Sequence, residues 1–166
     1  PPPSKPGMRS RFVRSEEIAA AQVEAALSTD VNVFACGIGA PKEVVARAKA
    51  LGKTTLALVG SRRHAQAALA VGVDVLVAQG TDAGAHTGPI GTFSLVPQVV
   101  DVAGDVPVLA AGGVATGRHI AAALALGAQG VWMGTAWLTS HEHAAKLSPT
   151  LVNKLLAARS EDTVIS

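Results

Sequence analysis

The stretch Val73-Asp-Val-Leu-Val-Ala-Gln-Gly-Thr-Asp-Ala-Gly-Ala-His86 joins a short apolar run to a glycine-rich loop. Its first part, through Ala78, is rich in valine and too apolar for a strand with one face in water. The run Thr54-Thr-Leu-Ala-Leu-Val59 has the same character. Strands that are apolar on both faces are typical of parallel sheets, whose faces are covered by helices. The stretch therefore predicts an α/β fold.

Helical and strand patterns alternate on both sides of this stretch. Capping residues or a first-turn proline precede several of the helical patterns, and a glycine follows them. These signals predict a helix that begins at Ser15, strand 31–36, helix 41–51, strand 54–59, helix 61–71, strand 73–78, strand 106–111, helix 117–126, strand 130–133 and a C-terminal helical tail.

The number of predicted strands leaves two architectures open. About five strands can be counted, whereas a closed (β/α)8 barrel has eight and usually needs about 250 residues. The chain is therefore expected to be part of a barrel or to form an open parallel sheet. Residues 1–14 are proline-rich and basic, so we expect a loop or linker there and one domain over residues 15–166.

One loop of the predicted sheet is longer than the others. The strands that start near residues 73 and 106 are 33 residues apart, whereas the neighbouring spacings are 19 and 24 residues. The surplus lies in Gly80–Thr92, directly after a strand. Parallel α/β folds build their functional sites at the carboxyl edge of the sheet, so we expect this loop to contribute to the functional site.

Composition excludes several classes of partner. Of the 166 residues, 49% are hydrophobic and 3% aromatic, and the formal net charge is only +2. This composition offers neither the basic surface nor the stacking rings that nucleic-acid binding needs. Apolar runs are too short to span a membrane. The single cysteine, Cys36, cannot form an internal disulfide, which fits a cytoplasmic protein.

His86 is the candidate catalytic residue. It lies in the enlarged loop after a buried strand, and an unperturbed imidazole, with a pKa of about 6.5, suits proton transfer near neutral pH. A histidine in a polar loop is more often a solvated or hydrogen-bonded residue without a catalytic role. The position of His86 at the carboxyl end of a strand is what favours catalysis.

Glycines also end the next two strands. Ala110-Ala-Gly-Gly113 ends one, and Met133-Gly-Thr135 ends the other. Their amide groups and the Thr135 hydroxyl could hold a phosphate, helped by the helix that begins near Gly117. Either motif alone is better explained by tight turns. The occurrence of both in adjacent units favours a phosphate site.

Other motifs fail on spacing. Gly52-Lys-Thr54 lacks the first glycine of a P-loop, and Gly37-Ile-Gly39 lacks the third glycine of a dinucleotide fingerprint. His141-Glu-His143 would place its imidazoles on divergent sides of a helix. No metal site is predicted.

Three motifs in order carry a resemblance to a known family. Val77-Ala-Gln-Gly-Thr-Asp-Ala-Gly-Ala-His86-Thr-Gly88, Val108-Leu-Ala-Ala-Gly-Gly113-Val-Ala-Thr-Gly117 and Gly130-Val-Trp-Met-Gly-Thr135 are similar to those of the nitronate monooxygenases, formerly called 2-nitropropane dioxygenases. The resemblance covers residues 31–140. It implies an FMN-dependent TIM barrel, a parallel (β/α)8 fold, of which this chain would hold strands 4–8 and the C-terminal part of the domain.

The resemblance also assigns roles to residues. The catalytic base or orienting group would be His86. The reaction would convert alkyl nitronates with O2 to a carbonyl compound and nitrite, so the partners would be small molecules. Ala85 departs from the glycine that the family commonly has before the histidine. The implied FMN-binding residues are Gln79, Gly80, Ala111, Gly112, Gly113, Met133, Gly134 and Thr135.

Alternatives remain open. Related flavin barrels act on acyl-CoA or enoyl-thioester substrates with the same histidine and phosphate motifs. A purine-nucleotide dehydrogenase would need a cysteine in the loop that holds His86, and the loop has none. A non-catalytic barrel fragment or interaction module is the alternative of another class. Exposed edges of such a partial barrel would favour association, including homo-oligomers.

Overall fold

The computed structural model describes residues 7–37, 39–84 and 86–162, with side chains from residue 17 onward. It contains one sheet of five parallel strands in the order β1-β2-β3-β4-β5. The strands are β1 (Val33–Cys36), β2 (Thr54–Val59), β3 (Val75–Gln79), β4 (Val108–Ala111) and β5 (Gly130–Trp132). The helices are α1 (Gly7–Leu27), α2 (Lys42–Ala50), α3 (Arg62–Ala70), α4 (Thr92–Ala103), α5 (Gly117–Ala125), α6 (His141–Ala144) and α7 (Pro149–Ala157), with 3-10 turns at Thr135–Trp137 and Ser160–Asp162.

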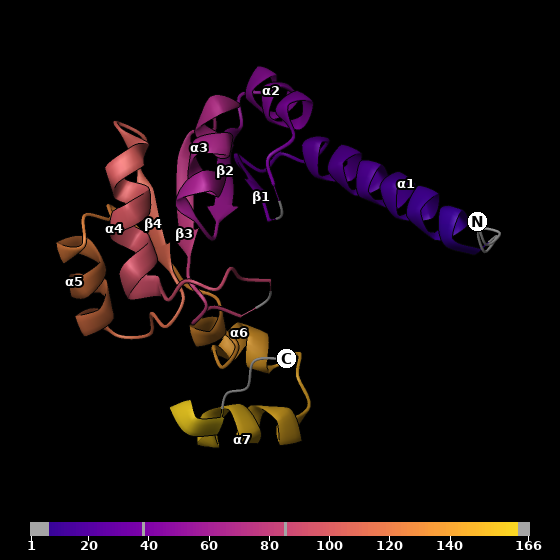
Figure 1. Cartoon of the computed structure of the whole chain (residues 1–166). Coiled ribbons are helices and arrows are strands. Elements are labelled where there is room, and N and C mark those ends of the chain that lie inside the picture. Colours follow the sequence, from indigo (N-terminus) through magenta and orange to yellow (C-terminus); the bar gives the residue numbers. More distant parts are fainter. Residues whose placement is uncertain (1–6, 38, 85, 163–166) are drawn as a thin grey trace, which may run out of the picture.

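The strand order is that of a barrel segment. Each strand pairs with the next strand of the chain, with no reversal of direction or order. Right-handed crossovers between such neighbours place all connecting helices on one side of the sheet. In Figure 1, α2, α3, α4 and α5 follow one another around the sheet in this way. The winding confirms the predicted parallel α/β class and favours a barrel over a doubly wound sheet.

The two faces of the sheet have separate apolar clusters. Leu76, Ala78 and Ala110 belong to the larger cluster, which joins the sheet to its helices. Leu56, Val77 and Ala111 form a smaller cluster on the opposite face. Successive residues of a strand alternate between these faces, so strands of this kind are apolar throughout. This explains the continuous apolar runs in the sequence.

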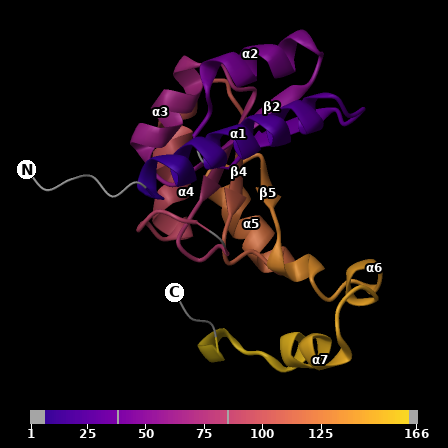
Figure 2. The ribbon, with the colours of Figure 1, turned by 90° about the vertical axis from the view of Figure 1, so that its right-hand side faces the viewer.

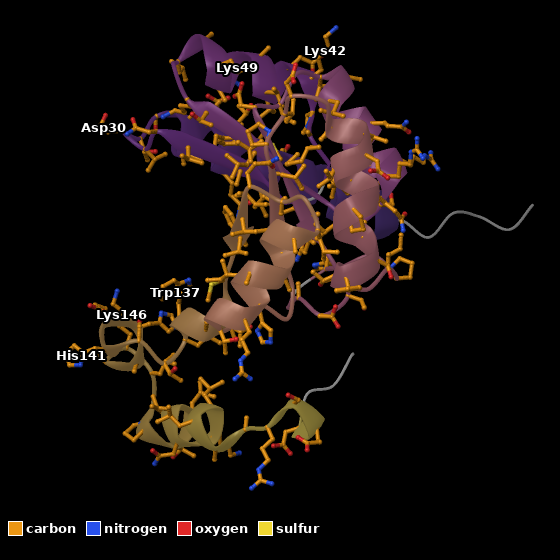
Figure 3. The ribbon with its side chains drawn as sticks, turned by 90° about the vertical axis from the view of Figure 1, so that its left-hand side faces the viewer. Asp30, Lys42, Lys49, Trp137, His141 and Lys146 are labelled. Carbon is orange, nitrogen blue, oxygen red and sulfur yellow. The ribbon has the colours of Figure 1, made fainter. Side chains whose placement is uncertain are left out.

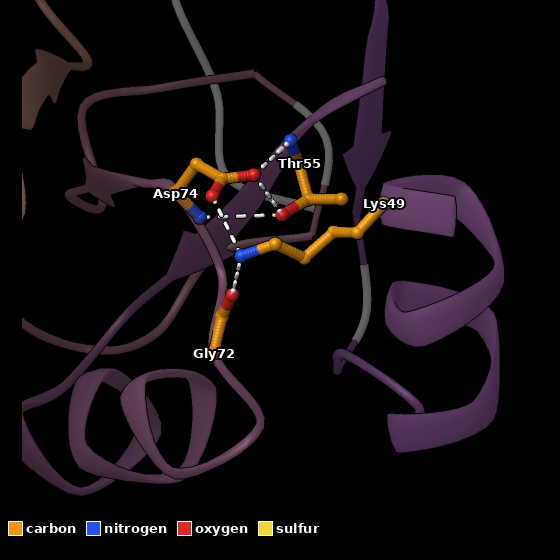
Figure 4. Close-up of polar contacts among 4 residues, drawn as sticks. All are labelled: Lys49, Thr55, Gly72 and Asp74. Atoms are coloured by element: carbon orange, nitrogen blue, oxygen red, sulfur yellow. Dashed lines mark hydrogen bonds and ion pairs between the residues drawn. The ribbon is translucent and has the colours of Figure 1, made fainter. Parts of the chain in front are cut away.

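A polar network closes the amino edge of the sheet. One carboxylate oxygen of Asp74 accepts hydrogen bonds from the amide of Thr55, at 2.8 Å, and from its hydroxyl, at 2.7 Å. Lys49 Nζ donates to the other carboxylate oxygen and to the carbonyl oxygen of Gly72, both at 2.7 Å. Figure 4 shows that the network ties α2 to the starts of β2 and β3. We expect this network to serve stability, because barrel chemistry occurs at the opposite edge of the sheet.

The first helix differs from the expectation. α1 begins at Gly7, so residues 7–14 are helical and not a loop, and the predicted start at Ser15 is wrong. The prolines that indicated a loop all precede this helix, and the residues that follow Pro6 can continue a helical backbone. α1 projects from the sheet as a rod (Figure 1). Residues 1–6 lie outside the described part of the chain.

Candidate active site

The loop between β3 and α4 lies at the carboxyl edge of the sheet. Gln79 Nε2 donates to the carbonyl oxygen of Gly84 at 3.1 Å, on the amino side of His86. The base of the loop is closed by a hydrogen bond from the Thr81 amide to the Ile90 carbonyl, at 2.9 Å. The sequence places a long loop here, and these contacts give the described part of it a defined shape.

A contact between two glycines holds the other side of the loop. A methyl group on Gly88 would lie 2.6 Å from the carbonyl oxygen of Gly60, and one on Gly60 would lie 3.0 Å from the Gly88 amide nitrogen. Real side-chain carbons do not approach backbone atoms at the shorter distance. The two backbones therefore contact each other directly, and the loop that contains His86 packs against the residue that follows β2.

His86 is exposed and lines a cavity of about 390 Å³. The other polar side chains that line this cavity are those of His64, Gln79 and Thr87. Apolar side chains from the end of β2 and from α3 also line it: Ala57, Leu58, Val59, Ala67 and Ala68. The cavity is within the range of about 300–1,000 Å³ that is usual for small-molecule sites.

Asp82, in the same loop, caps α4. Its Oδ2 accepts a hydrogen bond from the amide of Thr92, the first residue of that helix, at 2.9 Å. This backbone hydrogen bond, and a further one from the Thr92 side chain, lower the pKa of the Asp82 carboxyl below its ordinary value. The carboxylate is therefore charged at neutral pH, opposite the positive end of the helix.

Gly80 and Gly112 enclose Thr92. A methyl group on Gly80 would collide with the backbone nitrogen and hydroxyl of Thr92, and one on Gly112 would lie 2.6 Å from that hydroxyl. Thr92 Oγ1 donates to the carbonyl oxygen of Ala111 at 3.3 Å. These two glycines are thus required by packing within the chain, whatever they bind.

The turn after β4 has the backbone of an anion site. Gly112 has a φ of 107° and Gly113 a φ of 68°, values that favour glycine. Within residues 7–37, 39–84 and 86–162, neither amide donates a hydrogen bond. Successive amides in such a turn can hold an anion. The Asp82 carboxyl group stands close by, since a methyl group on Gly113 would lie 3.9 Å from its Cγ.

The end of β5 lies next to this turn. Ala111 pairs with Trp132, so the residues that follow the two strands are neighbours at the sheet edge. Gly134 and Thr135 are exposed, and Met133 is half-buried. Gly134 also lines a second cavity, of about 350 Å³, with Trp137, His143 and Lys146. Figure 3 shows Trp137 and Lys146 around α6, and Figure 2 shows α6 and α7 beyond the carboxyl edge.

Most of the chain matches one known protein family. Residues 10–166 match the family Nitronate monooxygenase. The chain belongs to this family.

The chain is similar to monooxygenases and to a dehydrogenase from other bacteria. A candidate monooxygenase of Mycobacterium tuberculosis is 50% identical over 145 residues, which are 87% of this chain and 38% of the relative. A Rhodococcus jostii dehydrogenase named for a carboxyl-CoA substrate is 36% identical over 87% of this chain and 40% of that dehydrogenase. A candidate nitronate monooxygenase of Staphylococcus aureus is 38% identical over 87% of this chain and 43% of that relative.

Solved structures give the same picture of the fold. FabK from Thermotoga maritima superposes with a TM-score of 0.81 at 36% identity, over 88% of this chain and 46% of that protein. Nitroalkane oxidase from Streptomyces ansochromogenes has a TM-score of 0.69 at 35% identity, over 80% of this chain and 43% of that protein. These neighbours are TIM-barrel enzymes, and the chain spans less than half of their length.

In this member of the family, the predicted site residues do not all line one cavity. Gln79 and His86 line the cavity on the β2 side of the loop. Gly112 and Gly113 lie on the β4 side, against Asp82, and are not among the residues of that cavity. Gly80 and Ala111 are buried beneath the loop. The predicted departure at Ala85 lies outside the described residues.

Sequence reasoning missed His64, Gly60 and Asp82. His64 lies on α3, in the unit before His86, and the rule that selected His86 would have found it: both follow the carboxyl end of a strand. Gly60 and Asp82 have no comparable signal, because the Gly60 contact joins residues far apart in the chain and the Asp82 contact depends on how the enlarged loop folds back onto α4. Among the described residues, no cluster of His, Cys, Asp and Glu could hold a metal ion, and no helix is long and apolar enough to cross a membrane.

Proposed function

We propose that the protein is an FMN-dependent oxidoreductase that converts alkyl nitronates with O2 to a carbonyl compound and nitrite. Membership of the nitronate monooxygenase family supports this reaction. The single observation that carries it is the position of His86, exposed on a cavity with an apolar floor at the carboxyl edge of the sheet. Because the chain spans less than half of its relatives, the activity is proposed for the complete natural chain.

The residues present fit a flavin phosphate. Gly112 and Gly113 offer amides with no partner in the described part of the chain, and their left-handed backbone can point both at one anion. Gly134 and Thr135 would complete this site from the neighbouring turn. The Asp82 charge near Gly113 opposes an anion, but the carboxylate is engaged by the amide at the start of α4. The flavin ring of a bound FMN would supply the redox chemistry with O2.

The chain would supply placement and proton transfer. Gln79, Gly80, Ala111 and Met133 would lie nearest the flavin ring. His86 would accept a proton from a neutral nitroalkane or stabilise the anionic nitronate, a role that an exposed imidazole at a cavity wall can serve. The apolar floor of the cavity would hold the alkyl chain and keep water from it.

Replacement of His86 tests this assignment. His86→Ala should retain FMN, measured by its absorbance after gel filtration, and should lose at least about a hundredfold in oxygen uptake with a nitroalkane, the usual contribution of general acid–base catalysis. His141→Ala, on the exposed short helix α6, is the matched control and should keep full activity. Full oxygen uptake by His86→Ala would remove the proposed role of His86.

A thioester substrate is the second candidate. The name of the Rhodococcus jostii relative contains a carboxyl-CoA, and that relative is 36% identical to this chain. Oxygen uptake with nitronates, compared with NAD(P)H consumption in the presence of enoyl-CoA compounds, separates the two activities. Consumption of NAD(P)H without nitronate oxidation would replace the first proposal by this one.

A non-catalytic module is the alternative from another class. A protein that stays colourless after incubation with FMN would favour that alternative, whereas a yellow protein supports the flavoenzyme. A cytoplasmic location stays a prediction from the single free cysteine, Cys36. Homo-oligomers also remain a prediction, based on the exposed strand edges.

A further inference from the structure

The cavity beside His86 has a second imidazole on its wall. His64 lines it from α3, and His86 lines it from the loop after β3. We propose that His64 and His86 together form an anion subsite, so that His64 determines specificity for the anionic nitronate over the neutral nitroalkane. This inference rests on the proposed function and names the charge state of its substrate.

The position of His64 is built into the start of α3. Ser61 is the N-cap, and its side chain accepts a hydrogen bond from the His64 amide at 3.2 Å. The imidazole is exposed, and no hydrogen bond joins it to another described residue. Its donors are therefore available to a ligand, while its backbone is held by the cap.

The contact between Gly60 and Gly88 brings the two imidazoles to one cavity. Gly60 directly precedes the N-cap of α3, and Gly88 lies two residues after His86. Their backbones meet at the distances given above. His64 and His86 therefore approach the cavity from two units of the sheet that are fixed to each other by a direct backbone contact.

The lining of the cavity favours an anion with a compact alkyl chain. Its described residues include no carboxylate, so nothing acidic competes for the imidazole N–H groups. Gln79 directs its amide nitrogen to Gly84, which leaves the two imidazoles and the Thr87 hydroxyl as the side-chain donors of the cavity. Alanine, leucine and valine side chains supply the floor. A small nitronate has both parts: two anionic oxygens and a short aliphatic chain.

Binding of butyrate tests the subsite without turnover. Butyrate shares the two-oxygen anionic head and short chain of an alkyl nitronate, and its dissociation constant can be measured on the FMN-loaded complete natural chain from the NMR shifts of the histidine ring protons. His64→Gln should weaken butyrate binding about tenfold, and His64→Lys, which supplies a charged N–H donor, should recover most of the loss. His141→Gln should leave the dissociation constant unchanged; its imidazole lies at α6 in Figure 3.

Steady-state kinetics supply the second readout. For the anionic nitronate, His64→Gln should raise KM about tenfold with little change in kcat, and for the neutral nitroalkane KM should stay within about twofold. Equal butyrate affinity in the wild type and His64→Gln, or equal KM changes for both substrates, would overturn the role of His64. Butyrate binding that depends on His64 in a protein without nitronate oxidation would instead overturn the proposed reaction and leave the anion subsite standing.

Discussion

Gly60 and Gly88 meet backbone to backbone, and this contact seats the loop that contains His86 on the end of β2. The 2.6 Å between a methyl group on Gly88 and the Gly60 carbonyl oxygen leaves no room for a side chain. The partner atom belongs to the backbone after a buried strand, so it cannot move aside as a flexible side chain would. The geometry of the candidate site therefore depends on two glycines that hold no catalytic group.

Gly88→Ala should displace the His86 loop. We expect a loss of about 1–3 kcal/mol in the free energy of unfolding, the usual cost of overpacking, together with a change in the ring-proton NMR shifts of His86. Urea denaturation measures the first effect. Gly84→Ala is the matched control in the same loop, because a methyl group there has no neighbour within 4 Å. Equal effects of the two substitutions would contradict the contact.

Asp82→Ala should weaken the start of α4. The variant loses the acceptor for the Thr92 amide, and we expect a cost of about 0.5–1 kcal/mol, low for a cap because the carboxylate is exposed. The folded pKa is lowered by the Thr92 hydrogen bonds, so the stabilisation is complete above the unfolded pKa of about 3.9 and is lost as pH falls through the folded pKa.

Urea denaturation at a series of pH values measures this cost for Asp82→Ala. The difference from the wild type should be constant near neutral pH and should shrink only in strong acid. Asp101→Ala removes an exposed carboxylate from the same helix, α4, and should have little effect. A difference that persists unchanged at the lowest pH would show that the Asp82 charge does not matter.

Asp74→Ala should be the more damaging change. Thr55 is fully buried, and the variant would leave both its amide and its hydroxyl without their acceptor, at a cost of about 2–3 kcal/mol. Lys49→Met removes the ion pair, whose side chains are partly exposed, and the hydrogen bond to the exposed Gly72 carbonyl group, and it should cost less than about 1 kcal/mol. Comparable losses in the two variants, measured by urea denaturation, would contradict this ranking.

The pH dependence of the Asp74 contribution has a defined sign. Burial is the largest single influence and raises the pKa of Asp74, but hydrogen bonds from Lys49 and Thr55 together outweigh it and lower the pKa. The contribution is therefore complete above the unfolded pKa of about 3.9 and is lost as pH falls through the lower folded pKa. The difference in stability between the wild type and Asp74→Ala should be constant above about pH 4 and should shrink as the pH falls below that value.

Lys53→Met tests the link between α1 and the sheet. Lys53 is only 8% exposed, and its Nζ donates to the carbonyl oxygens of Thr29 and Val31 at 2.7 and 2.8 Å. Methionine retains the apolar stem but removes both donors, so we expect a loss of about 1–3 kcal/mol. Lys42→Met, at an exposed position of α2, is the control. Thermal unfolding followed by circular dichroism measures both, and equal midpoints would contradict the link.

The fold could be predicted because its evidence is local. Each strand is an apolar run of its own, and capping residues such as Ser61 mark the neighbouring helices within a few residues. The start of α1 was predicted incorrectly because prolines near the terminus indicated a loop, and a helix can begin just after them. Local patterns also identified His86 and the glycine turns as candidates.

The sequence by itself determined the parallel α/β class, the enlarged loop and the family motifs, since these depend on residue types at short spacing. Only the tertiary structure decided that His64 shares a cavity with His86, that Asp82 caps α4, and that Gly60 supports the loop. The physical reason is that the first and third of these relationships join different βα units, whereas the second depends on how the enlarged loop folds back onto the start of its own helix. Their geometry follows from strand register and from crossovers that fold separate segments onto one sheet edge, and no residue spacing encodes it directly.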